Sequence, residues 1–361
     1  MNSYITNFIP HDVNPILQKE TIKWLKAYHA HDFDELFDRY SVSSEMIHSR
    51  VSYASGVNNF TPKSDDLYRI GHAQPYMEHR AGEAQRTIQN IFDELYSDEK
   101  DFQIDRLNHI SCSHYQSPSA AQIKVASFPK ESKTIVNHLY HMGCYAALPA
   151  LRNSQAMIAD GAQRVDNVHT ELCSFHLDRD DISPEQIIMR TLFADGAIKY
   201  SCVSEDHFKQ HKLSGFKLLT LKEEIVPETE KEMTWKLSRF GFAMTLSKKV
   251  PLYLAKKIEA FVEELIQGAQ LEQVPREELG FAIHPGGPKI VELIQKVLKL
   301  SDGQVKHSLD MLYHRGNMSS ATLPHIWNTY LKDTKAPRYI VTVAFGPGLT
   351  ITGGILEKCS A

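Results

Sequence analysis

The chain has 361 residues, of which 42% are hydrophobic and 23% are charged, so it is long enough for one large folded unit or two fused ones. This composition argues against disorder over most of the length. The net charge of −4 argues against nucleic acid as the main partner, although a few local lysines suffice to hold the phosphate of a small substrate.

The five cysteines are widely spaced and form no CxxC pair, so a zinc knuckle has no support. The first residues lack the basic head and apolar run of a signal peptide. No stretch approaches the roughly 20 apolar residues of a membrane span. We therefore expect a cytoplasmic protein with reduced thiols and no membrane partner.

Strands and helices are expected to alternate along most of the chain. Strands are expected at 104–113, 133–140, 164–173, 196–203, 216–226, 236–246 (with Gly241 at its centre) and 280–283, and helices at 145–159, 251–267, 289–300 and 304–314. Apolar runs at 339–345 and 349–356 flank Gly346-Pro347-Gly348, which predicts a hairpin. The pattern indicates a mixed α/β fold, and a polar break at 204–214 suggests two halves of similar order.

Cys144 is the first candidate for chemistry. It follows Gly143 and is predicted to open a helix, where the partial positive charge of the helix end would lower the pKa of its thiol. The preceding glycine would let the chain turn sharply and present the sulfur. The alternative is that Cys144 is a small buried hydrophobe, as most unpaired cysteines are.

A histidine and an asparagine in special loops complete a possible trio. His284 ends a predicted strand at a corner rich in proline and glycine, where α/β sites usually form. Asn317 follows Gly316, and its simplest role is to cap the next helix. A Cys, a His and an Asn in this order are also what a papain-like hydrolase needs, so the residue types alone leave the reaction open.

Several local strings carry a family resemblance. The strings at 281–288 (FAIHPGGP), 316–321 (GNMSSA) and 345–350 (FGPGLT) resemble the three C-terminal signatures of chalcone and stilbene synthases and their bacterial relatives, the type III polyketide synthases. The string at 140–144 (YHMGC) resembles their nucleophile segment, and 192–197 (LFADGA) resembles the string that follows it. Order and spacing agree over roughly the last two-thirds of the chain, which indicates a family member of the bacterial type.

The resemblance implies a thiolase-like layered αβαβα fold built from two similar halves, usually as a homodimer. Residues 1–205 would form the half that carries Cys144, and residues 206–361 the half that carries His284 and Asn317. The substrates implied are acyl-CoA and malonyl-CoA thioesters, with no metal or redox cofactor.

The resemblance also implies catalytic roles. Cys144 would take a starter acyl group from coenzyme A, and His284 would keep its sulfur ionised. Malonyl-CoA would then lose CO2, and His284 and Asn317 would stabilise the negative charge on its thioester oxygen. Attack of the resulting carbanion on the acyl-Cys144 carbonyl would build a pyrone, a resorcinol or a related polyketide.

Five cavity residues follow from the same match: Phe193, Cys173, Trp235, Met244 and Ser319. Phe193 corresponds to a gate between the coenzyme A tunnel and the site. Trp235 falls where chalcone-forming enzymes have glycine, and Met244 where they have phenylalanine. Phe193 also has a simpler interpretation as a core aromatic, and Trp235 as a core or interface aromatic.

Two basic residues are candidates for contacts with coenzyme A. Lys289 follows the 281–288 string at a helix start, where it could meet a phosphate, although a solvated surface charge is as reasonable. Arg50 aligns loosely with a basic coenzyme A contact. The loop at 117–120 is shorter than in plant enzymes, and the first hundred or so residues match poorly, which leaves the product open.

Three other functions remain possible from the sequence. A stand-alone β-ketoacyl synthase III-like enzyme shares the trio but performs one condensation, perhaps on carrier-protein substrates, and its usual C-terminal strings differ. A cysteine hydrolase would release free acid without malonyl-CoA. A catalytically inactive binding protein would be expected to have lost the cysteine.

Overall fold

One long sheet runs through the molecule. The computed structural model describes residues 2–29, 33–98 and 102–361. The strands of this part are β1 Ser3–His11, β2 Ile16–Leu17, β3 Ser49–Arg50, β4 Arg106–Ser111, β5 Ile135–Tyr140, β6 Arg164–Glu171, β7 Gly196–Ser204, β8 Ser214–Ile225, β9 Met233–Ser238, β10 Gly241–Leu246, β11 Leu279–Ile283, β12 Tyr339–Gly346 and β13 Thr350–Ser360. The helices are α1 Gln18–Tyr28, α2 Asp34–Tyr40, α3 Met77–Leu95, α4 Ala120–Ala126, α5 Ala147–Ala159, α6 Pro184–Leu192, α7 Glu205–Gln210, α8 Val250–Gly268, α9 Pro288–Leu298, α10 Asp302–Arg315 and α11 Thr322–Lys332, with short 3-10 turns η1 Cys173–His176, η2 Arg276–Glu278 and η3 Ser319–Ala321.

The order of the nine strands in the sheet separates the two ends of the chain. The order is β11-β12-β13-β8-β1-β7-β6-β4-β5. Every strand on the β1 side comes from residues 1–205, and every strand on the β8 side from residues 206–361. The antiparallel pair β1–β8 joins the two groups. The two-half division stays a prediction, because one hydrogen-bonded sheet crosses the expected boundary.

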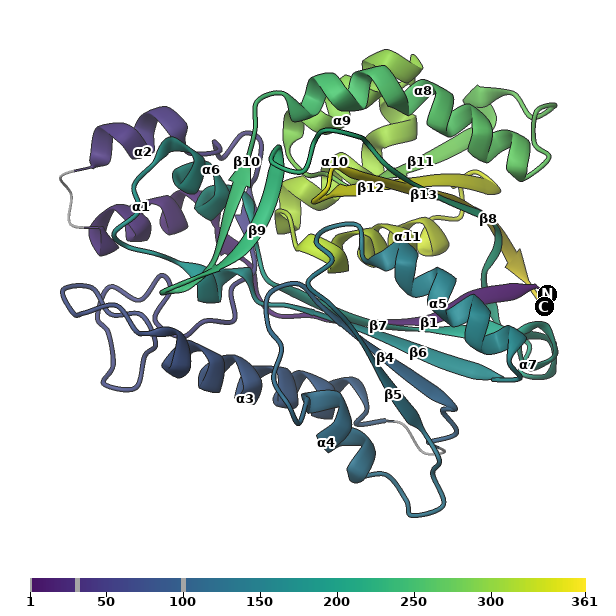
Figure 1. Cartoon of the computed structure of the whole chain (residues 1–361), viewed down its shortest axis with the longest axis horizontal. Coiled ribbons are helices and arrows are strands. Elements are labelled where there is room, and N and C mark those ends of the chain that lie inside the picture. Colours follow the sequence, from purple (N-terminus) through teal and green to yellow (C-terminus); the bar gives the residue numbers. More distant parts are fainter. Residues whose placement is uncertain (1, 30–32, 99–101) are drawn as a thin grey trace.

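The helices form layers on both faces of this bent sheet. In Figure 1, α8, α9 and α10 cover β8 and β11–β13 on one outer side, and α3 and α4 lie below β4–β7 on the other. Between the two strand groups lie α5 and α11. The central helix α5 contacts both β6 and β13, and α11 contacts both β7 and β11. This gives the expected α/β fold in the αβαβα order.

The sequence explains why particular helices take these layers. The outer helix α8 buries Leu254, Ile258, Phe261 and Leu265, which recur at helical spacing and face the sheet. The central helix α5 instead buries alanine and leucine over most of its first two turns. A helix between two strand groups needs apolar residues around most of its circumference, and small ones allow both groups to approach.

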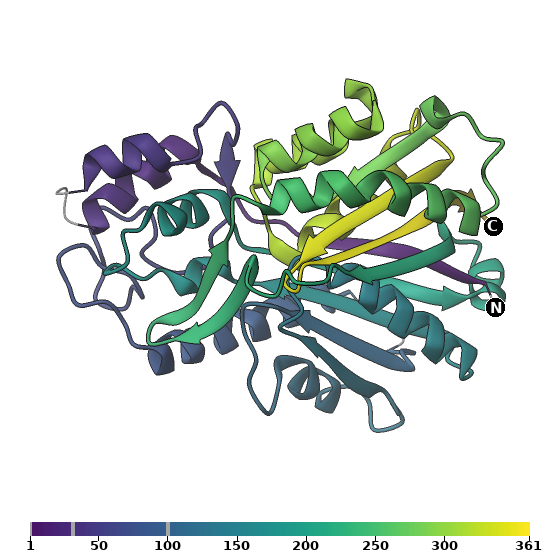
Figure 2. The ribbon, with the colours of Figure 1, turned by 45° about the horizontal axis from the view of Figure 1, so that its top comes forward.

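Two parts of the chain differ from the prediction. The segment 236–246, expected as one strand, belongs to a hairpin of β9 and β10 that turns at Arg239 and Phe240. Apolar residues alternate up to Leu237 and again from Phe240, and this shift of the pattern by one residue marks the turn that the sequence prediction missed. The poorly matching N-terminal region supplies β1 to the sheet, and its helices α1 and α2 pack against α6, which in turn contacts β10. Figure 2 shows these helices on the same side of the molecule as the hairpin. The polar break at 204–214 contains α7.

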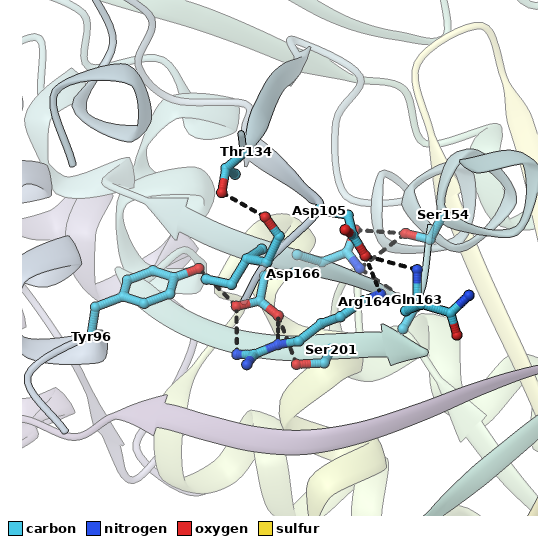
Figure 3. A network of polar contacts seen from close by, with 11 residues as sticks. Tyr96, Asp105, Thr134, Ser154, Gln163, Arg164, Asp166 and Ser201 are labelled. Atoms are coloured by element: carbon cyan, nitrogen blue, oxygen red, sulfur yellow. Dashed lines mark hydrogen bonds and ion pairs between the residues drawn. The ribbon is translucent and has the colours of Figure 1, made fainter. Parts of the chain in front are cut away.

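A buried polar network fastens β6 to its neighbours. Asp166, which is fully buried, accepts hydrogen bonds from the Tyr96 hydroxyl, the Arg164 guanidinium and the Ser201 hydroxyl (Figure 3). A buried carboxylate is tolerated when such donors replace water, and losing one partner of a buried pair costs about 3–5 kcal/mol.

Within the described ranges, no helix combines the length and apolarity needed to cross a membrane.

Candidate active site

Three cysteines lie together near the carboxyl ends of neighbouring strands. Strands β4, β5 and β6 are parallel, so their carboxyl ends lie on the same side of the sheet. Cys112 follows β4, Cys144 comes a few residues after β5, and Cys173 comes shortly after β6. Ligand sites in α/β folds form at the carboxyl ends of parallel strands. All three residues line the same pocket.

The turn that carries Cys144 depends on a glycine. Gly143 has φ +90°, and a β-carbon there would lie 2.5 Å from Cδ of Pro347. The loop between β12 and β13 therefore packs directly against the nucleophile segment. Cys144 does not open helix α5, as the sequence predicted, but lies in the turn that precedes its first residue, Ala147.

His284 and Asn317 come from the C-terminal half. His284 directly follows β11, and its backbone N–H donates to the Val343 carbonyl 2.8 Å away. Asn317 lies between α10 and η3, and pairs with Phe193 in a parallel bridge. His284 is 1% exposed and Asn317 is fully buried. The loops after β11 and α10 thus hold the two side chains in the interior of the protein.

Several buried polar atoms of these side chains have no partner. Within the described part of the chain, neither ring nitrogen of His284 is hydrogen-bonded, and the same holds for Nδ2 of Asn317. The Asn317 Oδ1 accepts from the Ser319 backbone N–H at 2.9 Å, so the side chain also caps η3. An unsatisfied buried polar group costs about 1–3 kcal/mol. Groups left in this state are available to a ligand.

The ionised thiol expected from the sequence is not found in this arrangement. Burial raises the pKa of Cys144 to about 12, against the opposing effects of Ser319 and Asn317 beside it. Burial lowers the pKa of His284 to about 3. Both groups are therefore neutral at pH 7. The prediction of a lowered Cys144 pKa was wrong for this state, because the position beside a helix end does not offset desolvation.

A large pocket opens onto Cys144. Its empty volume is about 1020 Å³, the open mouth included. Of the predicted site residues, it is lined by Arg50, Cys144, Cys173, Phe193, Trp235, Met244 and Ser319. His284, Asn317 and Lys289 are not among the described residues that line this pocket. Lys289 is instead exposed in the first turn of α9.

Trp235 and Met244 face each other across the β9–β10 hairpin. They are direct partners in its register. The Trp235 indole N–H donates to the Cys112 carbonyl at 2.6 Å, and the Met244 carbonyl accepts from Gln186 at 2.8 Å. These bonds fasten the hairpin to the nucleophile side and to α6. The hairpin that the sequence analysis missed is thus a wall of the pocket.

Sequence reasoning also missed a buried carboxylate in the pocket. Glu171 accepts hydrogen bonds from the Cys112 backbone N–H at 3.0 Å, from the Ser113 hydroxyl at 2.8 Å and from the Ser320 hydroxyl. Burial raises its pKa to about 6. The available signal was its position at the end of predicted strand 164–173, which lies next to strand 104–113 in a parallel sheet.

Solved structures of other proteins share this fold. The C-terminal type III polyketide synthase domain of Steely1, a type I/III hybrid from Dictyostelium, matches with a TM-score of 0.81 at 22% identity, over 99% of each chain. PKS-I from the brown alga Ectocarpus siliculosus matches with a TM-score of 0.83 at 19% identity, over 99% of this chain and 97% of that one. The protein therefore has the fold of the type III polyketide synthases, which confirms the thiolase-like fold class.

Sequence comparison supports the same relationship. Residues 217–360 match the family model for the C-terminal domain of chalcone and stilbene synthases. Probable polyketide synthase 1 of Dictyostelium discoideum is 31% identical over 221 residues, which cover 60% of this chain and 7% of that protein. Alpha-pyrone synthesis polyketide synthase-like Pks18 of Mycobacterium tuberculosis is 30% identical over 238 residues, or 63% of this chain and 58% of that protein.

Residues 217–360 are thus similar to the C-terminal domain of chalcone and stilbene synthases, and the chain is similar in sequence to the two polyketide synthases named above. The sequence matches span little more than half the length of the mycobacterial relative and a small fraction of the Dictyostelium one. Whether the chain is of the bacterial type stays a prediction.

Proposed function

We propose that the protein is an acyltransferase that condenses malonyl-CoA with an acyl-CoA starter held on Cys144. The observation that carries the proposal is the combination of a pocket-lining thiol with buried, unpartnered donors on His284 and Asn317. A nucleophilic thiol alone fits many reactions. A decarboxylation also requires hydrogen-bond donors that stabilise the negative charge on the thioester oxygen.

The first half-reaction would load the starter. The neutral His284 imidazole would accept the Cys144 proton as the two come into hydrogen-bond contact, because the thiolate then stabilises the imidazolium. The thiolate would attack the acyl-CoA carbonyl. The C–S bond to coenzyme A would break, the imidazolium would return its proton to the leaving thiolate, and the acyl group would remain on Cys144.

The second half-reaction would extend the chain. As the malonyl C–C bond breaks and CO2 leaves, the electron pair would move onto the thioester oxygen, where Asn317 Nδ2 and the His284 N–H would donate hydrogen bonds. The resulting carbon nucleophile would attack the acyl-Cys144 carbonyl. A C–C bond would form and the Cys144 thiolate would leave. The reaction needs only coenzyme A thioesters, without a metal or redox cofactor.

The apolar side chains that line the pocket support a linear aliphatic starter. Its wall includes Trp24 and Leu25 of α1, far along the chain from Cys144, together with Met189, Trp235 and others. The Trp235 indole occupies one wall. A linear acyl chain fits between such apolar side chains better than a bulky polyketide built on an aryl starter. We propose short products or a linear aliphatic starter.

The experiment is a product analysis. The protein is incubated with malonyl-CoA and a panel of aryl, short and long acyl-CoA starters, and products are identified by mass spectrometry. Several extensions ending in a ring support the proposal. A single β-ketoacyl product supports the one-condensation alternative, and free acid without use of malonyl-CoA supports a hydrolase.

We also propose a homodimer through the free edge of β5. Strand β5 ends the sheet and pairs only with β4 among the described strands, and Ile135 on it is 51% exposed. An open edge of this kind is a template for a second copy. Light scattering should give twice the mass of one chain, and Ile135→Lys should lower it. A monomeric wild-type protein would exclude the dimer.

The proposed setting is the cytoplasm. All five cysteines are free, and three of them line the pocket, which suits a reducing compartment. Cell fractionation with an antibody against the protein would test this, and recovery in a secreted fraction would contradict it.

A further inference from the structure

Arg50 is buried and its guanidinium faces the interior. It is 6% exposed and follows Ser49 in the short strand β3. Its Nε donates to Oε1 of Gln18 at 2.6 Å, and Gln18 itself is fully buried. Its Nη1 donates to the carbonyls of Arg190, at 2.8 Å, and Phe193. These bonds use Nε and Nη1 inside the protein and give no support to the predicted contact with a coenzyme A phosphate, which stays a prediction.

The two carbonyls belong to the C-terminal end of helix α6. Arg190 lies in its last turn and Phe193 is its C-cap. The last carbonyls of a helix lack partners within the helix and carry partial negative charge. A guanidinium that donates to two of them therefore fixes where the helix ends. The residue fixed there is Phe193, which lines the pocket.

The segment at the C-terminal end of α6 is also hydrogen-bonded to the backbone of Asn317. The Asn317 backbone N–H donates to the Leu192 carbonyl at 3.0 Å, and the Ala194 N–H donates to the Asn317 carbonyl at 2.8 Å. Asn317 therefore takes its position from the segment around Phe193. Any shift of that segment moves the Asn317 backbone, and with it the carboxamide.

The aliphatic part of Arg50 also touches the turn before Asn317. A β-carbon on Gly316 would lie 2.9 Å from Cγ and 3.0 Å from Cδ of Arg50. Gly316 has φ +72°, which side chains other than glycine rarely adopt. Arg50 is thus held against one partner of the bridge, Phe193, through its charged end, and against Gly316, the residue before the other partner, through its stem.

We infer that Arg50 is a positioning residue that sets the Asn317 amide and the Phe193 ring in the proposed decarboxylation. This inference rests on the proposed function. Arg50 lines the pocket, but its hydrogen bonds go to Gln18, Arg190 and Phe193, so the proposed effect on the reaction passes through the Phe193 segment to Asn317. A displacement of about 1 Å in a catalytic group can cost 10²-fold in rate.

The test separates the two half-reactions. Arg50→Lys keeps the charge, but a single ammonium cannot reproduce the planar fork. We expect the rate of malonyl-CoA decarboxylation to fall about 10- to 100-fold. The rate of Cys144 acylation, measured by intact-protein mass spectrometry, should change by less than about 3-fold, because acylation does not depend on the Asn317 amide. In an Asn317→Ala background, Arg50→Lys should cause no further loss, because residues that act as one unit are not additive. Equal losses in both half-reactions, or additive losses, would overturn the inference.

A matched control is Arg80→Lys. Arg80 is 1% exposed and also donates to backbone carbonyls, those of Pro75, Phe175 and Leu177, but in the described part of the chain it has no hydrogen bond to the Asn317 segment. It should lower thermal stability without changing the ratio of decarboxylation to acylation. If Arg50→Lys does not fold, Gln18→Met removes the acceptor of Arg50 Nε and should shift the ratio in the same direction by a smaller factor.

Hydrogen exchange tests the positioning even if the proposed function fails. Peptides covering 189–195 and 313–319 should exchange faster in Arg50→Lys than in wild type, with no such change in Arg80→Lys. Unchanged exchange overturns the inference whatever the enzyme does. A wild-type protein that neither acylates nor decarboxylates overturns the proposed function, while faster exchange still supports the structural role of Arg50.

Discussion

Removing the Trp235 indole should change the product range. Trp235→Gly opens the pocket wall formed by the β9–β10 hairpin, whereas Trp235→Phe keeps an aromatic ring and removes only the N–H that binds the Cys112 carbonyl. We expect Trp235→Gly to accept bulkier starters or add more extension units. Trp235→Phe should keep the wild-type starter range, since the volume of the ring is largely retained.

The stability cost of these variants follows from the contacts. A fully buried aromatic side chain covers roughly 150–250 Å², which at about 25 cal/mol per Å² gives roughly 4–6 kcal/mol. Trp235 is only partly buried, so about 2–4 kcal/mol is expected, and its hydrogen bond adds about 1 kcal/mol. Trp235→Gly should therefore lose about 3–5 kcal/mol of unfolding free energy in total, and Trp235→Phe about 1–2 kcal/mol.

The assay combines urea unfolding with product analysis on the same starter panel. Folding must first be established for each variant at the assay temperature. A folded Trp235→Gly protein with the wild-type starter and product range would refute the assignment of Trp235 to the cavity. If Trp235→Phe shifts the products as far as Trp235→Gly does, the hydrogen bond to Cys112, and not the volume of the indole, controls the outcome.

Three further predictions concern the groups around Cys144. Asn317→Ala should still acylate Cys144 but decarboxylate malonyl-CoA about 10²–10³-fold more slowly, as measured by CO2 release; normal decarboxylation would leave Asn317 as a cap alone. Because burial raises the pKa of Cys144 to about 12, its alkylation by iodoacetamide without substrate should keep accelerating above pH 8, and a plateau below pH 7 would show that the ion pair with His284 already exists. Burial raises the pKa of Glu171 from 4.5 to about 6, so between these pH values this carboxyl group holds its proton longer in the folded protein and lowers the unfolding free energy by about 2 kcal/mol as the pH rises. Burial also raises the pKa of Asp195 to about 6, so Glu171→Gln should show a smaller fall, not none, in urea titrations at pH 4.5 and 7, and a fall equal to that of the wild type would contradict the assignment.

The sequence predicted the parts of the fold that local pattern specifies. Helix α8 was visible because its buried residues recur at helical spacing. The β12–β13 hairpin was visible because glycine and proline mark its turn. The β9–β10 turn at Arg239 and Phe240 carries no such signal before Gly241, so it was read as continuous strand. The family strings predicted the order of the layers, which periodicity could not supply.

The site shows the same division. Cys144 and the neighbouring pocket residues were predicted from strings that resemble a family, and the structure brings many of them together. The charge state of Cys144 was not predictable, because it depends on burial by segments distant in the chain. Arg50 was assigned from a loose alignment with a basic coenzyme A contact. Its internal bonds to α6 arise from long-range packing that no local pattern records.

Intact-protein mass spectrometry tests the central claim most directly. The wild-type protein is mixed with an acyl-CoA starter, the reaction is quenched with acid, and the protein is digested to locate the added mass. The account predicts one acyl group on Cys144, no adduct in Cys144→Ala, and conversion of the wild-type adduct into a longer chain when malonyl-CoA is added. An acyl group on Cys112 or Cys173, or release of free acid with no effect of malonyl-CoA, would contradict it.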